Sequence, residues 1–365
     1  MLVFGTRPEA IKMCPLVNEL KTRESIKTVV CVTGQHRQML DMVLDTFKVV
    51  PDYDLSIMKA GQTLFDITTN ILNKIGTVLD EVKPDVVLVH GDTSTTFVTA
   101  LACFYKQIPV GHVEAGLRTY NIYSPYPEEF NRQAVGIVAK YNFSPTELSK
   151  QNLLNEGKDS DSIYVTGNTA IDALKTTVRD DYTHPELEWA KDSRLIMITA
   201  HRRENLGEPM HNMFKAIRRV MEEHPDVKAI YPIHMNPVVR QAADEELGGC
   251  DRIRIIEPLE VLDFHNFLSR SFMILTDSGG IQEEAPSLGK PVLVMRDTTE
   301  RPEGVKAGTL KLVGTDEDVI YENFKLLLES EDAYNAMAQA SNPYGDGLAC
   351  KRIADVLCYS DRQRG

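Results

Sequence analysis

The 365-residue sequence lacks the patterns that mark several special classes of protein. No apolar run approaches the roughly 20 residues that a membrane-spanning helix needs, and the first residues lack the basic region and apolar core of a signal peptide. None of the six cysteines forms a CxxC pair, and none of the nine histidines lies in an HExxH pattern. We therefore expect no membrane segment, no metal site and no disulfide framework, but buried free thiols and a cytoplasmic location.

Positive charge is scarce relative to negative charge. The chain has 40 Lys and Arg residues against 53 Asp and Glu residues, and its formal net charge is −13. Nucleic acids and anionic membranes require a basic surface, so neither is expected as a partner. A small anionic ligand would need local cations to overcome the general negative field.

Short apolar runs alternate with segments of helical length along most of the chain. This alternation predicts parallel sheets flanked by helices, and the length fits two α/β domains. The sequence has no GxGxxG, so the usual signature of NAD binding is missing. We expect two Rossmann-like domains, residues 1–167 and 168–346, with the C-terminal helix 347–365 returning to the first. The helical, polar stretch from 169 to about 194, broken at Pro185, would be the linker between them.

Acidic side chains follow two successive predicted strands. Residues 84–90 and 108–113 are mostly apolar, as in buried parallel strands, and Asp92 and Glu114 come just after them. Ligands of such sheets bind at the carboxyl ends of the strands, so both acids should face one crevice. Glu128, on a segment expected to be irregular, could reach it. Any one of these acids could equally be a helix cap or a solvated loop charge.

The first predicted strand is followed by a candidate anion site. Thr6 and Glu9 have the spacing of a capping box, which places a helix start directly after the strand. Arg7 and Lys12 lie on that helix near its N-terminus, where backbone N–H groups also favour an anion. Both cations could instead be ordinary surface charges.

The second half of the chain offers further anion-binding groups. The cluster 201–203 (His-Arg-Arg) follows a predicted strand, and the turn 278–280 (Ser-Gly-Gly) is a candidate phosphate cradle. Glu284, on the next helix, could accept the hydroxyls of a ribose. A plain tight turn, a solvated helix face and a pair between Arg203 and Glu204 are the simpler alternatives. Carboxylates in one half and phosphate binders in the other would suit a nucleotide sugar held in a cleft between them.

These stretches together resemble the non-hydrolysing UDP-N-acetylglucosamine 2-epimerases. The matching motifs occur in order across essentially the whole chain, at residues 4–13, 90–93, 111–118, 127–129, 201–204, 276–284 and 342–347. The resemblance implies a glycosyltransferase-B architecture with the active site in the interdomain cleft. It also implies a homodimer that converts UDP-GlcNAc reversibly to UDP-ManNAc without a cofactor, for cell-surface polysaccharide synthesis. The implied route is elimination of UDP to a 2-acetamidoglucal, followed by re-addition.

The resemblance also implies roles for individual residues. The catalytic residues would be Asp92, Glu114, Glu128 and His201. The residues that bind the UDP-sugar would be Arg7, Lys12, Ser278, Gly279, Gly280 and Glu284, with His234 at the end of its strand. Three further positions match a segment that binds a second UDP-GlcNAc as an allosteric activator in bacterial relatives, namely Gln35, His36 and Gln38.

Three other functions stay open at this stage. A hydrolysing epimerase would release free ManNAc and UDP, but the intact motif at residues 7–12 favours the non-hydrolysing branch. A glycosyltransferase would share the architecture and transfer the sugar to an acceptor. A nucleotide-sugar sensor would tolerate loss of the three carboxylates, all of which are present.

Overall fold

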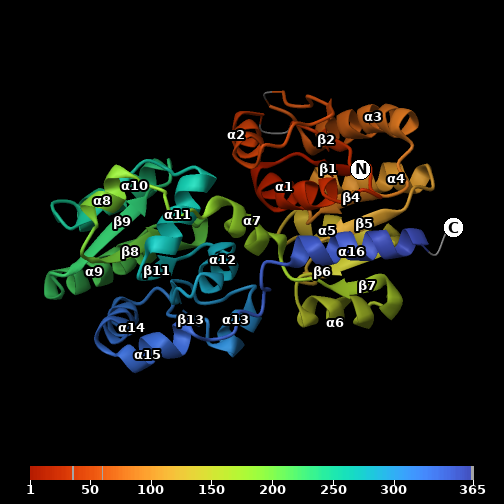
Figure 1. Cartoon of the computed structure of the whole chain (residues 1–365). Helices are drawn as coiled ribbons and strands as arrows, with labels where there is room; N and C mark the ends of the chain where they lie inside the picture. The colour runs from red at the N-terminus through yellow and green to blue at the C-terminus, as the bar shows by residue number, and fades with distance from the viewer. Residues whose placement is uncertain (35–36, 60, 363–365) are drawn as a thin grey trace. The chain divides into compact units, whose positions relative to one another are not determined.

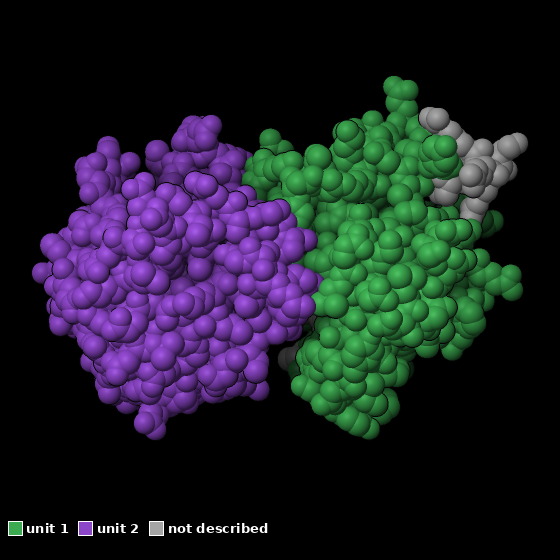
Figure 2. Space-filling model, turned by 90° about the horizontal axis from the view of Figure 1, so that it is seen from below, with its two compact units in different colours: residues 1–176, 344–365 green, residues 177–343 purple. Residues whose placement is uncertain are grey.

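The structure, a computed structural model, describes residues 1–34, 37–59 and 61–362. The chain divides into two compact units, which Figure 2 shows in different colours. Unit 1 comprises Met1–Thr176 and Tyr344–Gly365, and unit 2 comprises Thr177–Pro343. Each unit contains one parallel sheet with flanking helices, so the predicted α/β fold with two Rossmann-like domains is confirmed.

Unit 1 is built on a seven-stranded sheet in the order β3-β2-β1-β4-β5-β6-β7. Its strands are β1 (Leu2–Phe4), β2 (Val30–Val32), β3 (Tyr53–Asp54), β4 (Val87–His90), β5 (Val110–Val113), β6 (Tyr141–Ser144) and β7 (Ile163–Val165). Because β1 pairs with both β2 and β4, the strand order reverses between β1 and β4. In open α/β sheets ligands bind beside such a switch point, at the carboxyl ends of the strands.

The helices of unit 1 cover its sheet (Figure 1). They are α1 (Arg7–Lys21), α2 (Arg37–Phe47), α3 (Leu64–Val82), α4 (Ser94–Tyr105), α5 (Glu128–Val138), α6 (Glu147–Asn155), α7 (Thr169–Thr177) and α16 (Ala349–Arg362), with a 3-10 turn at Ser160–Ser162. The C-terminal helix α16 packs against α1. Its first turn is also fastened by Asp172 of α7, which accepts the backbone N–H groups of Ala349 and Cys350.

Unit 2 repeats this topology with a six-stranded sheet in the order β10-β9-β8-β11-β12-β13. Its strands are β8 (Arg194–Thr199), β9 (Val227–Pro232), β10 (Ile253–Ile256), β11 (Met273–Thr276), β12 (Val292–Val294) and β13 (Leu310–Leu312). Its helices are α8 (Pro185–Trp189), α9 (Glu208–Glu223), α10 (Pro237–Leu247), α11 (Val261–Arg270), α12 (Ile281–Ser287), α13 (Pro302–Ala307), α14 (Glu317–Glu329) and α15 (Glu331–Ala338), with a 3-10 turn η2 at Arg203–Asn205. The strand order reverses between β8 and β11.

Local sequence explains several of these elements. The predicted capping box at the start of α1 is confirmed, because Thr6 and Glu9 exchange side-chain to backbone hydrogen bonds. The central strands β4 and β11 are buried along their whole length, as their uninterrupted apolar runs predict. All six cysteines are free thiols, and four of them are buried. In the part of the chain that the structure describes, we find no helix long and apolar enough to cross a membrane.

Other elements differ from the prediction. The stretch 169–194 holds the helices α7 and α8, and the boundary between the units falls within it, after Thr176. Because α7 buries Ala170, Ile171 and Leu174 and largely belongs to unit 1, that unit extends past residue 167. The short edge strand β3, which pairs with β2, was not predicted. Two residues are too few to show a strand pattern in the sequence.

Candidate active site

Glu114 lies at the carboxyl end of β5 in contact with two cationic or titratable side chains. Lys12 Nζ is 2.7 Å and 2.8 Å from its two carboxylate oxygens, and His90 Nε2 is 2.9 Å from Oε2. Burial by itself would raise the pKa of Glu114, but Lys12 and His90 outweigh it and hold this pKa well below its usual range. Glu114 is therefore ionised at neutral pH. Its backbone φ of +65° is uncommon for a residue with a side chain and is typical of functional sites.

Asp92 follows the neighbouring strand β4, and α5 fixes its position. Arg132 Nη2 contacts Asp92 Oδ2, and the side-chain amide of Asn131 donates to the Asp92 carbonyl at 2.8 Å. The strands β4 and β5 pair directly, with His90 opposite Val113, so Asp92 and Glu114 follow adjacent strand ends as predicted. The sequence reasoning missed Arg132. Its signal was a cation one helical turn beyond the acidic pair at the start of α5.

Glu128 is the first residue of α5, so the prediction that it lies on an irregular segment is wrong. The helix begins here because Pro127 precedes it and acidic residues favour a first turn. The next acid, Glu129, is fully buried and accepts the Tyr120 N–H at 2.9 Å and the Gln133 amide at 2.8 Å. Glu128 is half-buried and forms no side-chain hydrogen bond or ion pair with any residue that the structure describes.

Glu9 joins the two turns at the switch point of unit 1. Its Oε2 accepts the backbone N–H groups of Gly5 and Thr6, at 3.0 Å and 2.8 Å. Its Oε1 accepts the hydroxyls of Thr93 and Thr96, at 2.7 Å and 3.2 Å. One buried carboxylate thus fixes the turn after β1, which leads to Arg7, relative to the turn after β4, which carries Asp92.

His112 fastens the same turn from within the sheet. This fully buried residue of β5 places Nε2 2.7 Å from the carbonyl oxygen of Gly91. Burial lowers the pKa of His112 to about 3, so the ring is neutral and Nε2 carries the hydrogen that it donates. Its Nδ1 has no hydrogen-bond partner in the described structure. A second proton would therefore be buried without an acceptor.

In unit 2, His201 follows β8 and His234 follows β9. Their rings stack with centroids 5.4 Å apart and planes inclined by 12°. Partial burial is the main factor that lowers the pKa of His201; His234 and Arg202 lower it further, and Asp277 opposes them. His201 is therefore neutral at pH 7.

Three arginines of unit 2 converge on Glu300. Arg202 and Arg301 each place a nitrogen 3.1 Å from its Oε1, and Arg296 lies 2.8 Å from its Oε2. Burial would raise the pKa of Glu300, but these arginines, Arg301 foremost, lower it to about 2. A Cβ atom added at Gly279 would lie 3.0 Å from Glu300, so the predicted phosphate cradle borders this cluster.

The sequence reasoning identified only Arg202 of these three arginines. The other two follow β12, so the rule that ligands bind at strand ends would have indicated them. Arg203, also singled out, is exposed at the start of η2. Glu284 lies on α12, with Oε2 3.8 Å from His265 Nε2, as part of the segment that includes Ser278, Gly279 and Gly280.

Some of the predicted site falls beyond what the structure describes. Gln35 and His36 lie outside the described residues, and Gln38 is described only as part of the backbone of α2. Their assignment to an allosteric site stays a prediction. Within the described ranges, no cluster of three or more His, Cys, Asp or Glu side chains is arranged to hold a metal ion.

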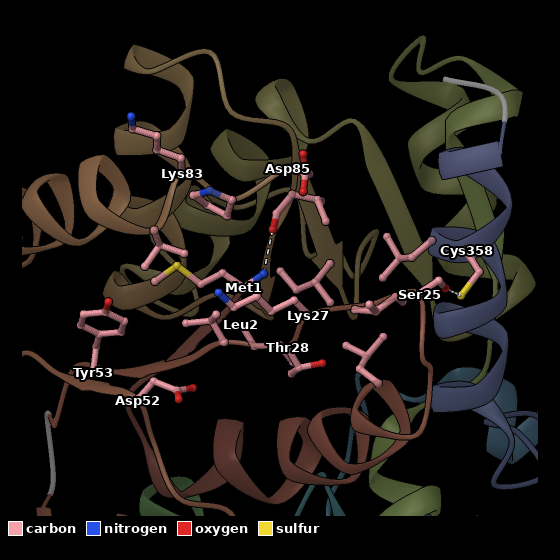
Figure 3. A pocket seen from close by; sticks show the side chains of 18 of the residues that line it. Met1, Leu2, Ser25, Lys27, Thr28, Asp52, Tyr53, Lys83, Asp85 and Cys358 are labelled. Atoms are coloured by element: carbon pink, nitrogen blue, oxygen red, sulfur yellow. Dashed lines mark hydrogen bonds between the residues drawn. The ribbon is translucent and has the colours of Figure 1, made fainter. Parts of the chain in front are cut away.

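Unit 1 also contains a cavity of about 740 Å³ at the amino ends of its strands (Figure 3). It is lined by Met1 at the start of β1, Tyr53, Asp85 and Cys358 of α16, among others. None of the predicted catalytic or substrate-binding residues lines this cavity. The candidate site of unit 1 instead lies at the carboxyl ends of the same strands.

Comparison with known proteins decides the family. A sequence model described as UDP-N-acetylglucosamine 2-epimerase matches residues 18–358. The chain belongs to this family. The UDP-N-acetylglucosamine 2-epimerase of Bacillus subtilis (strain 168) is 64% identical over 359 residues, which are 98% of this chain and 94% of the relative. The resemblance in the sequence motifs is thereby confirmed, and the chain is an isomerase by its family.

Solved structures of the family agree in fold. One UDP-N-acetylglucosamine 2-epimerase is 61% identical with a TM-score of 0.93, covering 100% of this chain and 96% of that chain. The Neisseria meningitidis UDP-GlcNAc 2-epimerase, solved bound to UDP-GlcNAc, is 50% identical with a TM-score of 0.88. This likeness covers 98% of the present chain and 99% of the Neisseria chain. The expected fold class of two Rossmann-like units of glycosyltransferase-B type is confirmed.

Proposed function

We propose that this protein interconverts UDP-GlcNAc and UDP-ManNAc in the cytoplasm and supplies ManNAc units for cell-surface polysaccharide synthesis. Membership of the epimerase family and the Neisseria relative bound to UDP-GlcNAc support this substrate. The observation that carries the proposal is the pair of carboxylates at adjacent strand ends, one of which, Glu114, is held ionised.

The proposed reaction proceeds by elimination and re-addition. The C2 hydrogen of a sugar is not acidic, so its direct removal as a proton is implausible. Breaking the C1–O bond releases UDP, and loss of the C2 proton leaves a 2-acetamidoglucal. UDP then adds back to C1 while a proton is returned to C2 on the opposite face. Every atom is conserved and no electron is lost, so the reaction does not call for an external cofactor.

The two units supply different groups to this chemistry. Asp92, Glu114 and Glu128 of unit 1 stabilise the positive charge that develops on the sugar and share the proton transfers. His201 of unit 2 acts on the phosphate side of the reaction. The remaining ligands of the UDP-sugar are Arg7, Lys12, His234, Ser278, Gly279 and Gly280, with Glu284 on the ribose. A carboxylate kept ionised, as Glu114 is, suits stabilisation of the positive charge.

Proton NMR of UDP-GlcNAc incubated with the protein in D2O tests the proposal. We expect UDP-ManNAc with deuterium at C2. Free ManNAc and UDP as primary products would instead indicate a hydrolysing epimerase. An unchanged spectrum, with the Bacillus subtilis enzyme as active control, would favour a glycosyltransferase or a nucleotide-sugar sensor.

We also propose that the chain forms a homodimer through α4 and α5 of unit 1. These helices pack against each other, and they expose Phe104, Tyr105, Phe130 and Ile137, the last of which is 75% exposed. Several large apolar side chains exposed on two packed helices favour a protein interface there. Light scattering during gel filtration should show a dimer, which Ile137→Glu converts to a monomer. The matched change Val319→Glu, at an exposed position of α14 in unit 2, should leave the dimer intact.

A further inference from the structure

Asp277 is a buried carboxylate to which the proposed reaction assigns no role. It follows β11 at the switch point of unit 2, and its side chain is 0% exposed. Its Oδ2 accepts the backbone N–H groups of His201 and Arg202, both at 2.9 Å, and the side-chain amide of Asn205 at 3.2 Å. These donors all belong to the segment after β8. One oxygen of Asp277 therefore fixes the loop that carries His201.

The other oxygen of Asp277 is buried without a hydrogen-bond partner among the described residues. Most buried polar groups are paired, and leaving one unpaired is costly, so such an atom needs an explanation. This oxygen, Oδ1, lies 3.7 Å from His201 Nδ1, which is too far for a hydrogen bond but within reach of a small rotation of the ring.

The His201 ring lies between a dry interior and an accessible surface. Its side chain is 43% exposed, while Asp277 next to its Nδ1 is inaccessible. The face of the ring stacks on His234, which restrains the ring plane. Because Nδ1 faces Asp277, Nε2 is on the opposite side of the ring, away from that carboxylate.

A carboxylate beside one imidazole nitrogen has two known effects. It fixes the tautomer in which that nitrogen carries the hydrogen, and it stabilises the imidazolium if the other nitrogen takes up a proton. Asp277 also fixes the loop, so a single carboxylate sets both the position and the tautomer of His201.

We propose that Asp277 is the positioning residue of His201. Asp277 Oδ1 accepts the hydrogen of His201 Nδ1, and His201 Nε2 then faces the substrate. The inference rests on the proposed role of His201 on the phosphate side of the reaction. In this arrangement Nε2 accepts a proton, or donates one to the departing diphosphate, while Asp277 stabilises the protonated ring. Asp277 itself touches neither substrate nor reacting atoms.

The tautomer of His201 tests this directly. Nitrogen-15 NMR of the full-length protein with labelled histidine, assigned with His201→Gln, should show Nδ1 protonated and Nε2 unprotonated at pH 8. In Asp277→Asn the amide oxygen can still accept the loop N–H groups, whereas its NH₂ faces Nδ1, so the hydrogen should move to Nε2. A hydrogen on Nε2 in the unaltered protein, or a tautomer unchanged in Asp277→Asn, would overturn the proposal. Should Asp277→Asn fail to fold, the spectrum of the unaltered protein decides alone.

Kinetics separates positioning from simple support of the fold. We expect Asp277→Asn to lower kcat about 10- to 100-fold with KM within about twofold. The loss should vanish when Asp277→Asn is made in the His201→Gln background, because both changes remove one interaction. Losses that multiply independently would overturn the proposal.

Asp251→Asn, an exposed control in unit 2, should change neither rate nor tautomer. If the unaltered protein does not epimerise UDP-GlcNAc, the proposed function fails, and the NMR result still decides the role of Asp277.

Discussion

At the carboxyl edge of its sheet, unit 1 presents carboxylates, whereas unit 2 presents arginines. Asp92 and Glu114 in unit 1 are paired with Arg132 and Lys12. In unit 2 three arginines converge on Glu300, and they also pair with Glu204 and Glu283. Apart from the extra edge strand β7 of unit 1, both sheets have the same strand order, so the fold does not dictate this difference in charge. The loops after the strands dictate it, which is why one fold can hold a sugar in one unit and a diphosphate in the other under the proposed function.

The two units nevertheless hold a turn at the switch point in the same way. Glu9 in unit 1 and Asp277 in unit 2 are buried carboxylates at the switch point that accept backbone N–H groups of a turn. They differ in what their second oxygen does. In Glu9 it accepts two threonine hydroxyls, whereas in Asp277 it faces His201 without a hydrogen bond. Both carboxylate oxygens of Glu9 are therefore used in structural hydrogen bonds, whereas Asp277 keeps one oxygen that can accept a hydrogen bond from the imidazole of His201.

The largest effect should come from Asp92→Asn, which tests whether catalysis depends on the carboxylates of unit 1. We expect kcat to fall about 10³-fold, because a neutral amide neither stabilises positive charge nor transfers protons. The dissociation constant of UDP, measured by calorimetry, should change less than about threefold. Asp85→Asn, which alters an exposed acid before the amino end of the same strand, is the matched control and should be silent. Joint loss of turnover and UDP affinity would count against a purely catalytic role.

The next effect should be on stability and should be confined to unit 1. Glu9→Ala removes the acceptor of the Gly5 and Thr6 N–H groups and of the Thr93 hydroxyl, whereas the Thr96 hydroxyl keeps the His90 carbonyl, so we expect the free energy of unfolding to fall by about 2–4 kcal/mol. Glu9→Gln can keep most of these bonds and should lose less than about 1 kcal/mol.

Urea unfolding can assign that loss to one unit. The single tryptophan, Trp189, lies in α8 of unit 2, so its fluorescence reports that unit, whereas circular dichroism reports both. We expect Glu9→Ala to shift the dichroism transition and leave the fluorescence transition in place. An equal shift of the dichroism and fluorescence transitions would show that the two units unfold together and do not have separate stabilities.

A smaller, pH-dependent effect should come from His112. Its pKa is lowered to about 3 in the folded protein, against an ordinary value near 6.5. Between these two values the unfolded chain binds a proton at His112 and the folded chain does not. The stabilisation that comes from keeping His112 neutral is complete above about pH 6.5. It is lost as the pH falls towards 3, by up to about 1.4 kcal/mol per pH unit. His112→Gln should remove this slope when unfolding is measured between pH 6.5 and 5. The surface change His211→Gln, in unit 2, should keep it; equal slopes in all three proteins would refute the assignment.

The smallest effect should come from Arg202→Ala, which tests the arginines of unit 2. We expect UDP affinity to fall about 5- to 10-fold at low salt, because one charge-assisted contact to a phosphate is lost. The difference should shrink at high salt, since Arg202 is partly exposed and its charge is screened. Arg218→Ala, on the surface of α9, should not alter UDP binding. A fall in kcat with unchanged affinity would place Arg202 in the chemistry instead.

The parts of the fold and site that depend on local pattern could be predicted. The apolar runs before Asp92 and Glu114 end where β4 and β5 end, and parallel pairing then brings the two acids to adjacent strand ends. The capping box of Thr6 and Glu9 fixed the start of α1 to the residue. Such features need only a few neighbouring positions in the sequence.

The contacts that give the site its charge states could not be predicted in this way. Lys12 and Glu114 are 102 positions apart, and the Asp277 acceptor and its His201 donor are 76 apart. No local pattern reveals that these side chains meet. Sequence reasoning therefore treated Lys12 as a phosphate ligand alone and assigned Asp277 no role. For the same reason α7 was taken for a linker, because its buried face is covered by residues distant in the sequence.

The return of α16 to unit 1 has a consequence for synthesis on the ribosome. Unit 2 is continuous in sequence, whereas unit 1 needs Tyr344 onward to complete its packing on α1 and α7. At about 5–20 residues per second, translation of the intervening segment takes roughly ten to thirty seconds. During that interval unit 1 lacks α16, so the side of α1 that α16 covers is exposed. The unit that emerges first is thus the last to be finished.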